Sequence, residues 1–250
     1  MKISILIPTF NNLSYLKFFL NSLKKNSLFE HEIIIHVNDG SDGTLDFVKK
    51  SNFKFTHSKE NIGLCSSMNN AYKLSTSDFL LYAHDDMYFC KNWDKYLIDE
   101  INKQKNNFYY LSGTNVSTRF GLINYNCGDT LENFDENKFL KFCIDDNTPD
   151  LQSAHWAPHL IHRELWDKIG GFSEEFNPGD GSDPDFCMKL WLENVRIFKG
   201  ISKFKVYHFN SLTTRNNKVT LNNGTKIFLL KYGFNPKFFR KYYLKGNNSI

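Results

Sequence analysis

Two adjacent carboxylates end the apolar run Phe79-Leu80-Leu81-Tyr82-Ala83-His84-Asp85-Asp86-Met87. The length of the run and its β-favouring residues predict a buried strand. Asp85 and Asp86 would then lie at the carboxyl end of that strand, where open α/β sheets bind their ligands. Neighbouring carboxylates repel each other and lose hydration when they are partly buried, and a bound divalent cation relieves both costs. A solvated turn explains the pair equally well, because Asp is also frequent in turns.

The first hundred residues alternate between strand and helix patterns around this run. Apolar runs predict strands at 3–7, 32–37, 54–58 and 79–83, and helical spacing predicts helices at 13–25, 44–50 and 64–74. Strands separated by helices of this length imply parallel pairing with right-handed crossovers. The chain is therefore predicted to be an α/β protein with a doubly wound sheet, whose loops after the strands form a binding crevice.

The pattern is looser beyond residue 91. We expect a helix at 94–105, a strand at 109–113, a strand-to-helix element at 160–166 and a helix at 185–193. Residues 117–150 are polar and are expected to be irregular.

Length and composition fit a globular chain with one full core, since 41% of the 250 residues are hydrophobic. No segment approaches the roughly 18 uncharged apolar residues that span a bilayer. The apolar start of the chain is broken by Pro8 too early for a signal peptide. The five cysteines are scattered without a Cys-x-x-Cys pair, which argues against a disulfide framework or a zinc knuckle. We therefore expect a soluble, cytoplasmic protein.

Charge is divided between an acidic body and a basic tail. Residues 194–250 hold twelve basic and no acidic residues, which leaves 19 basic and 27 acidic residues in 1–193. Residues 226–245 mix these basic residues with Phe and Tyr. We expect first a helix packed on the body, second contact with an anionic membrane surface, and only distantly nucleic-acid binding.

Polar motifs follow three of the predicted strands. They are Pro8-Thr9-Phe10-Asn11, Asn38-Asp39-Gly40-Ser41-Asp42 and His84-Asp85-Asp86. Because the carboxyl ends of parallel strands lie side by side, these motifs would line one crevice. Each could be turn chemistry alone, but three together are hard to attribute to turns.

Further motifs continue this order along the chain. They are Asn61-Ile62-Gly63 with Asn69, Gly170-Gly171-Phe172 and Asp183-Pro184-Asp185. The whole series, from residue 3 to about His208 with gaps in 105–150, resembles the GT-A glycosyltransferases of the inverting family 2. The resemblance implies a GT-A, Rossmann-like fold with a central, mainly parallel mixed sheet flanked by helices.

The resemblance implies a site for a nucleotide-sugar donor. Phe10 would lie against the nucleotide base, and Asp39 would accept a hydrogen bond from the imide nitrogen of the base, which favours UDP. The implied donor-binding residues are Pro8, Thr9, Phe10, Asn11, Asp39, Asn61, Gly63, Asn69 and Asp85.

It also implies a site for Mn²⁺ or Mg²⁺ on Asp85, Asp86 and His208, where the ion offsets leaving-group charge. Position alone favours a strand-end histidine with one hydrogen bond at His208, whereas the family order favours a ligand. Which carboxylate touches the ion, and whether His84 or His208 assists, stays open.

The resemblance places the catalytic base at Asp183. Inverting transfer needs one carboxylate, held away from the metal, that removes the proton of the acceptor hydroxyl. Asp183 is also expected to cap a helix whose first residue is Pro184, and the two roles are compatible. Trp156 is a candidate platform for a sugar ring because aromatic faces stack on pyranoses, whereas Trp191 is expected in the core.

Three positions depart from the family pattern. Met68 stands where many relatives have Arg, Asn38 replaces a common Asp, and the first acidic position of the metal motif falls on Ala83 or His84. These departures leave open a catalytically inert module that binds a nucleotide sugar or a glycan. A sugar-phosphate nucleotidyltransferase is the other alternative, but the loop after the first strand lacks the Gly-rich, basic sequence that those enzymes carry.

The sequence thus predicts a metal-dependent inverting glycosyltransferase that uses a nucleoside diphosphate sugar and a hydroxyl of a glycan or lipid-linked glycan. We expect a GT-A domain at 1–210, with a donor half at 1–105 and an acceptor half at 106–210. A basic aromatic tail at 211–250 is expected to be helical and could place the protein at the inner membrane face.

Overall fold

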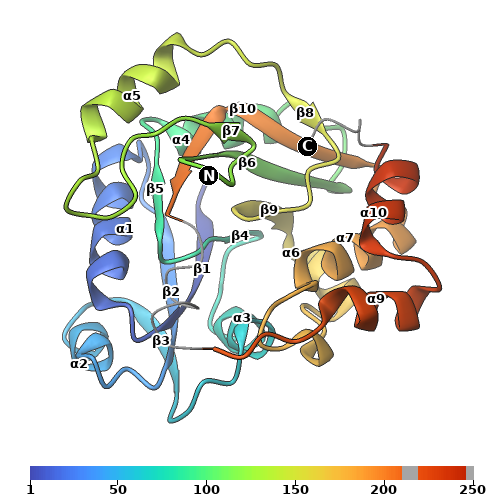
Figure 1. The fold of residues 1–250 in the computed structure, drawn as a ribbon, viewed down its shortest axis with the longest axis horizontal. Coiled ribbons are helices and arrows are strands. Elements are labelled where there is room, and N and C mark those ends of the chain that lie inside the picture. Colours follow the sequence, from blue (N-terminus) through green and yellow to red (C-terminus); the bar gives the residue numbers. More distant parts are fainter. Residues whose placement is uncertain (210–218, 246–250) are drawn as a thin grey trace.

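The computed structural model describes residues 1–209 and 219–245. Within these residues ten strands form one central sheet (Figure 1). The strands are β1 (Ile3–Phe10), β2 (Glu32–Asn38), β3 (Lys54–Ser58), β4 (Phe79–Tyr82), β5 (Met87–Phe89), β6 (Tyr109–Ser117), β7 (Ile123–Asn124), β8 (Leu151–Gln152), β9 (His159–His162) and β10 (Ile197–His208). The helices are α1 (Leu13–Asn26), α2 (Thr44–Lys49), α3 (Leu64–Tyr72), α4 (Trp93–Ile101), α5 (Glu136–Asp145), α6 (Arg163–Ile169), η1 (Glu174–Phe176), α7 (Ser182–Leu192), α9 (Gly224–Tyr232), α10 (Pro236–Phe238) and η2 (Phe239–Tyr243).

The strand order is β3-β2-β1-β4-β9-β6-β10-β5, with β7 beside β6 and β8 beside β10. β3, β2, β1 and β4 pair in parallel, so the loops after them gather at one edge of the sheet. β9 runs antiparallel between β4 and β6, and β5 runs antiparallel to β10. The predicted α/β fold with a mixed sheet and flanking helices is confirmed.

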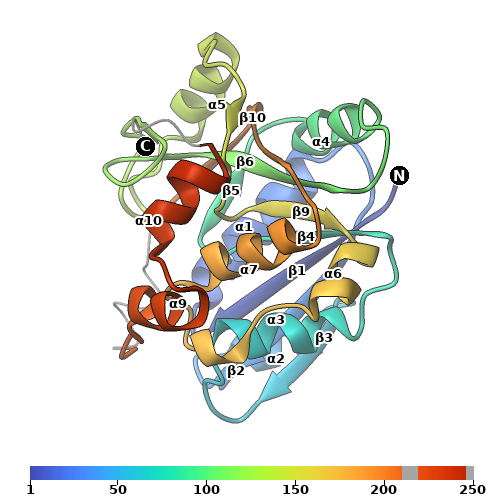
Figure 2. The same ribbon diagram turned by 90° about the vertical axis from the view of Figure 1, so that its right-hand side faces the viewer.

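Helices cover both faces of this sheet, with α1 and α2 on one side and α3, α6 and α7 on the other (Figures 1 and 2). Apolar side chains at helical spacing on α1 are buried, as expected for a helix packed on a sheet. The predicted β1–α1–β2–α2–β3–α3–β4 series is confirmed, with boundaries that differ by at most three residues.

Two segments differ from the sequence expectation. Residues 117–150 contain α5, in which Phe139 is buried and Leu140, Phe142 and Cys143 pack against the core while partly exposed. The helix expected to begin near Asp185 begins at Ser182, and Gly181, at a φ of 82°, is its N-cap. Asp183 is therefore the second residue of α7, and the expected cap role of its side chain is wrong.

The C-terminal helices pack on the body beside α7 and η1 (Figure 1). Phe228 of α9 and Phe239 of η2 are buried. Lys231 lies 2.8 Å from Asp185 of α7 and 2.7 Å from Glu175 of η1. Helices within 224–243 of the predicted tail pack on the body, whereas its parts at 211–218 and 246–250 lie outside the described residues. None of the helices in the described parts of the chain has the length and apolar character needed to cross a bilayer.

Candidate functional site

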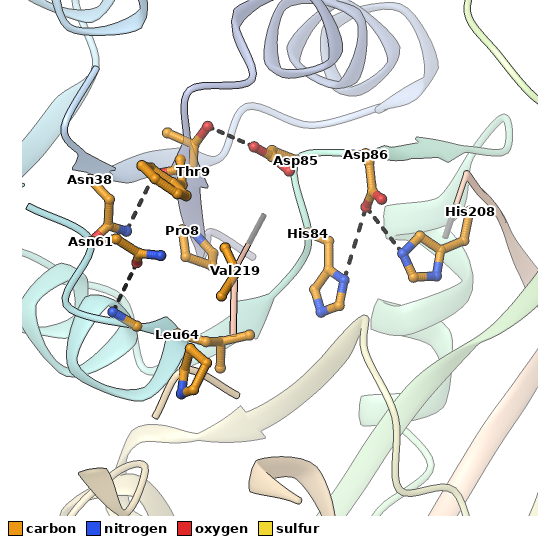
Figure 3. Close-up of a pocket in the computed structure, with 13 residues that line it drawn as sticks. Pro8, Thr9, Asn38, Asn61, Leu64, His84, Asp85, Asp86, His208 and Val219 are labelled. Atoms are coloured by element: carbon orange, nitrogen blue, oxygen red, sulfur yellow. Dashed lines mark hydrogen bonds and ion pairs between the residues drawn. The ribbon is translucent and has the colours of Figure 1, made fainter. Parts of the chain in front are cut away.

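A cavity of about 190 Å³ opens where β1, β2 and β4 end (Figure 3). Its walls come from the loops after these strands and from the start of α3. Two residues from later in the chain, His208 at the end of β10 and Val219, complete them. The lining residues are Pro8, Thr9, Phe10, Asn38, Asn61, Gly63, Leu64, His84, Asp85, Asp86, Pro178, His208 and Val219. The residues predicted from the sequence that line it are Pro8, Thr9, Phe10, Asn61, Gly63, Asp85, Asp86 and His208.

The two carboxylates that end the β4 run have different surroundings. Oδ2 of Asp85 accepts a hydrogen bond of 2.6 Å from the Thr9 hydroxyl, which holds this side chain toward β1 (Figure 3). Burial, and then the charge of Asp86, raise the pKa of Asp85 to about 7. Asp86 instead faces two histidines. Of the pair, only Asp86 belongs to a cluster of potential metal ligands.

That cluster, here called the triad, consists of His84, Asp86 and His208. Oδ1 of Asp86 lies 3.0 Å from Nε2 of His208 and 3.9 Å from Nδ1 of His84. Apart from these contacts within the triad, Oδ1 of Asp86 and Nε2 of His208 have no polar partner in the described part of the chain. Ligand atoms of one first-row ion lie about 2.0–2.2 Å from it and so about 3–4 Å from one another. The triad therefore fits a divalent metal ion.

The ionisation of the triad follows from burial and mutual charge. Burial lowers the pKa of His84 to about 4, and the charge of His208 adds to this. Burial opposes the positive charge of His208 too, but Asp86 outweighs it, so the pKa of His208 is raised. Burial opposes the negative charge of Asp86, but His208 outweighs it and lowers the pKa of Asp86. The hydroxyl of Tyr82 lies 2.6 Å from Nε2 of His84, which leaves Nδ1 of His84 to face Asp86.

The loops after β1 and β2 are tied together by side chains. Nδ2 of Asn11 donates to Oδ2 of Asp39 at 2.8 Å, and Oδ1 of Asn11 accepts from the Gly40 amide at 2.9 Å. The Asn11 amide lowers the pKa of Asp39, which is half-buried. Asn11 and Asp39 both adopt positive φ angles, of 44° and 57°, in these tight turns. Neither residue lines the cavity itself, but they shape the rim beside Phe10.

Asn38 fixes three elements at the base of the cavity. Its Nδ2 donates to the Ser67 hydroxyl of α3 at 2.9 Å, and its Oδ1 accepts from the Ile62 amide at 2.9 Å. Asn38 stands at a position where an Asp is common in the family pattern. Its side chain joins the end of β2 to the Asn61–Gly63 loop and to α3.

A loop that sequence reasoning did not single out closes the same region. Oδ1 of Asn177 accepts from the Cys65 amide at 3.0 Å and so caps the start of α3. A Cβ at Gly63 would lie 2.4 Å from this oxygen, so only glycine fits there. The only sequence signal for this contact was the Asn-Pro dipeptide at 177–178, which marks a turn but not its partner.

Besides Asn11 and Asp39, two more residues predicted to contact the donor, Asn69 and Trp156, lie outside the cavity. Asn69 donates to the Phe172 carbonyl at 2.9 Å and accepts from the Phe172 amide at 2.9 Å, which ties α3 to the Gly170–Phe172 turn. The Trp156 indole donates to the Gly113 carbonyl at 2.8 Å and packs near Gly200 of β10. The structure does not bring either side chain to the cavity wall.

The cavity wall carries no Lys or Arg from the described residues. Met68, where relatives have Arg, is fully buried in the core and cannot contact a ligand. The positive charge that balances an anionic ligand in this cavity would therefore come from His208 or from a cation that the triad could hold.

Asp183 lies in the first turn of α7, close enough to His208 for the two charges to interact. Its Oδ1 is buried and has no hydrogen-bond partner among residues 1–209 and 219–245. Burial raises the pKa of Asp183 to about 7, although the charge of His208 lowers it in part. A buried, unpartnered carboxylate with a pKa near neutrality is suited to taking up a proton.

Comparison with known proteins identifies the class. The family model "Glycosyl transferase family 2" matches residues 4–170, and the chain belongs to this family. Over 97 residues the chain is 33% identical to "Uncharacterized glycosyltransferase YfnE" of Bacillus subtilis (strain 168), which is 37% of this chain and 25% of that protein. The chain thus spans about a quarter of the length of this curated relative.

Solved structures show the same fold at low sequence identity. S. aureus TarS 1-349 in complex with UDP-GlcNAc superposes with a TM-score of 0.65 at 20% identity, over 92% of this chain and 65% of that chain. GalNAc-T7 with UDP, GalNAc and Mn²⁺ gives a TM-score of 0.64 at 13% identity, over 97% of this chain and 56% of that chain. The predicted GT-A glycosyltransferase of family 2 is confirmed. The roles of all the site residues stay predictions, and Asp183 and His208 also lie beyond the matched residues 4–170.

Proposed function

We propose that this protein transfers a glycosyl group from a nucleoside diphosphate sugar to an acceptor hydroxyl with inversion at the sugar carbon. The observation that carries the proposal is the triad at the wall of a cavity formed by the loops after β1, β2 and β4. Such loops hold the ligand in open α/β sheets, and the cavity offers a base-side wall at Phe10 and a cation site at the triad.

UDP is the nucleotide that we propose for the donor. The carboxylate of Asp39 is ionised, since its pKa is lowered, and a carboxylate accepts from the imide N–H of uracil. Support comes from the neighbours of known structure, because the TarS structure contains UDP-GlcNAc and the GalNAc-T7 structure contains UDP.

We propose that the triad holds Mn²⁺ or Mg²⁺, with His84 as a ligand in place of Asp85. When bound, the ion supplies Lewis-acid stabilisation of the departing diphosphate. The chain's own residues prepare for it: Thr9 keeps Asp85 turned away, and Tyr82 orients His84 toward Asp86. No Lys or Arg from the described residues lies at the cavity wall to take over this task.

Asp183 is the base in this proposal. Its carboxylate takes the proton of the acceptor hydroxyl while the hydroxyl oxygen attacks the sugar carbon, and the bond to the diphosphate breaks on the opposite face. The buried Oδ1 supports this role because no side chain of the described residues competes for it. The acceptor we propose is a hydroxyl of a glycan or lipid-linked glycan, and we propose the division into a GT-A domain at 1–210 and a tail at 211–250.

A thermal-shift screen of nucleotide sugars, with and without Mn²⁺, tests the donor site, because a ligand of the native state raises its melting temperature. We expect a shift with UDP-sugars that requires the ion. Release of UDP from the stabilising donor then separates an enzyme from an inert binding module, which would give the shift without turnover.

A further inference from the structure

The two C-terminal helical segments each expose lysines together with large apolar side chains, mostly at intervals of three or four residues. On α9 these are Lys226, Leu229 and Leu230, and on α10 and η2 they are Lys237, Phe238, Lys241 and Tyr242, followed by Lys245. Residues four apart lie on one face of a helix. Each segment thus has a buried face, which holds Phe228 or Phe239, and an outward face of apolar and cationic residues.

The large apolar residues on the outward faces are strongly exposed to solvent. The exposed fractions are 46% for Leu229, 77% for Leu230, 45% for Phe238 and 57% for Tyr242. Phe228 and Phe239 are in ring contact, so the two segments are neighbours, and both lie on the side of the molecule that Figure 2 turns to the viewer. The four lysines form no ion pair within the described residues.

The charge of the outward faces of α9, α10 and η2 indicates which kind of partner binds them. Residues 194–250 contain no Asp or Glu, so the face combines cationic charge with apolar and aromatic side chains and carries no acid. This combination suits the interface of an anionic lipid bilayer, where apolar rings enter the headgroup region and lysines meet lipid phosphates. We infer that α9, α10 and η2 form a docking face for an anionic membrane surface.

Docking through this face has a geometric consequence for the site. Oδ2 of Asp180 accepts a hydrogen bond of 2.8 Å from the Gly224 amide at the start of α9, and the Asp180 amide donates to Asn222 at 3.0 Å. Asp180 immediately precedes Gly181, the N-cap of α7. A membrane-bound α9 therefore brings the α7 end that carries Asp183 close to the bilayer. If the proposed transfer holds, this favours an acceptor attached to a lipid.

Co-sedimentation of the full chain with vesicles tests the docking face. We expect binding to vesicles that contain phosphatidylglycerol, weak binding to phosphatidylcholine alone, and release by salt. Each phosphate-facing lysine contributes roughly fivefold, so Lys237→Gln/Lys241→Gln should weaken the partition about 25-fold. Lys49→Gln/Lys50→Gln, at the C-terminal end of α2, removes two exposed lysines elsewhere and should change nothing.

A second pair of double variants, one on the docking face and one elsewhere, tests the apolar side chains of the face. Leu230→Ser/Phe238→Ser should weaken vesicle binding, whereas Phe120→Ser/Ile144→Ser, at positions 75% and 81% exposed, should not.

The inference is overturned if vesicle binding is absent or independent of anionic lipid, or if the test and control variants behave alike. It is also overturned if the face variants abolish self-association or RNA binding while vesicle binding is unaffected. UDP-induced thermal shifts, measured in parallel, report the donor site separately from the membrane.

Discussion

Nε2 of His208, at the end of β10, lies 3.0 Å from Oδ1 of Asp86, in the loop after β4. This contact joins the two halves of the sheet at the cavity, and His84 completes the triad from the same loop. Asp85, the neighbour of Asp86, takes no part in it because Thr9 holds its carboxylate.

Asp86 belongs to the triad and Asp85 does not, so substitutions of the two carboxylates should affect metal binding differently. Asp86→Asn and His208→Ala should each reduce Mn²⁺ affinity by at least about tenfold, because the first removes the negative charge of a ligand and the second removes an imidazole ligand, whereas Asp85→Asn should retain the affinity. Depletion of the free Mn²⁺ signal in electron paramagnetic resonance, with UDP present, measures this directly. Equal losses in the Asp85 and Asp86 variants would contradict the triad.

The donor set of the triad gives a prediction for metal selectivity. Two imidazoles and one carboxylate favour a first-row transition ion, whereas Mg²⁺ prefers oxygen ligands. Mn²⁺ should therefore bind more tightly than Mg²⁺, and His84→Asp should shift the preference toward Mg²⁺. Competition of Mg²⁺ against bound Mn²⁺ in both proteins measures the change, and an unchanged ratio would exclude His84 as a ligand.

Two glycines with positive φ form a matched pair for the donor loop. A Cβ at Gly63 would meet Oδ1 of Asn177 at 2.4 Å, whereas a Cβ at Gly170 would meet nothing within 4 Å. Gly170→Ala should cost about 1–2 kcal/mol from backbone strain alone. Gly63→Ala should cost about 3 kcal/mol or more, because it adds a clash and an almost glycine-specific conformation, and it should weaken UDP binding.

Urea unfolding and a UDP titration of the two alanine variants check this pair. Similar losses of stability at both positions would show that Asn177 does not constrain the Asn61–Gly63 loop.

Burial of Asp183 predicts the pH dependence of transfer. The base must be ionised, and burial raises its pKa to about 7, so activity should fall as the pH falls below that value. Asp85 has a pKa near the same value, and Asp85→Asn removes that group. The acid limb of kcat/KM should persist in Asp85→Asn, and its disappearance there would assign the limb to Asp85 instead.

Much of the donor half was predictable because its signals are local. Apolar runs and helical spacing gave the elements from β1 to β4, and parallel pairing then placed the Pro8, Asn38 and Asp85 loops at one edge. The antiparallel insertion of β9 between β4 and β6 was not predictable, since pairing between distant strands leaves no local pattern. α5 was missed because its apolar residues stand within the long polar segment 117–150 and only Phe139 among them is fully buried.

The finer arrangement of the site depends on side-chain contacts that no local pattern encodes. Sequence order identified Asp85 and Asp86 as candidates, but the hydroxyls of Thr9 and Tyr82 decide which side chains face His208. Asn69 and Trp156 were reasonable candidates by residue type, yet backbone groups at Phe172 and Gly113 engage their polar atoms.

Asp183→Asn is the most direct test of the proposed transfer. Transfer from the donor identified by thermal shift should fall about 10²- to 10⁴-fold, the range that one general base contributes, while donor binding measured by calorimetry stays unchanged. Asp185→Asn is the control in the same helix, because that carboxylate is bound by Tyr232 and Lys231 and should affect stability instead of turnover. Full transfer activity in Asp183→Asn would contradict the assignment of the base and with it the proposed mechanism.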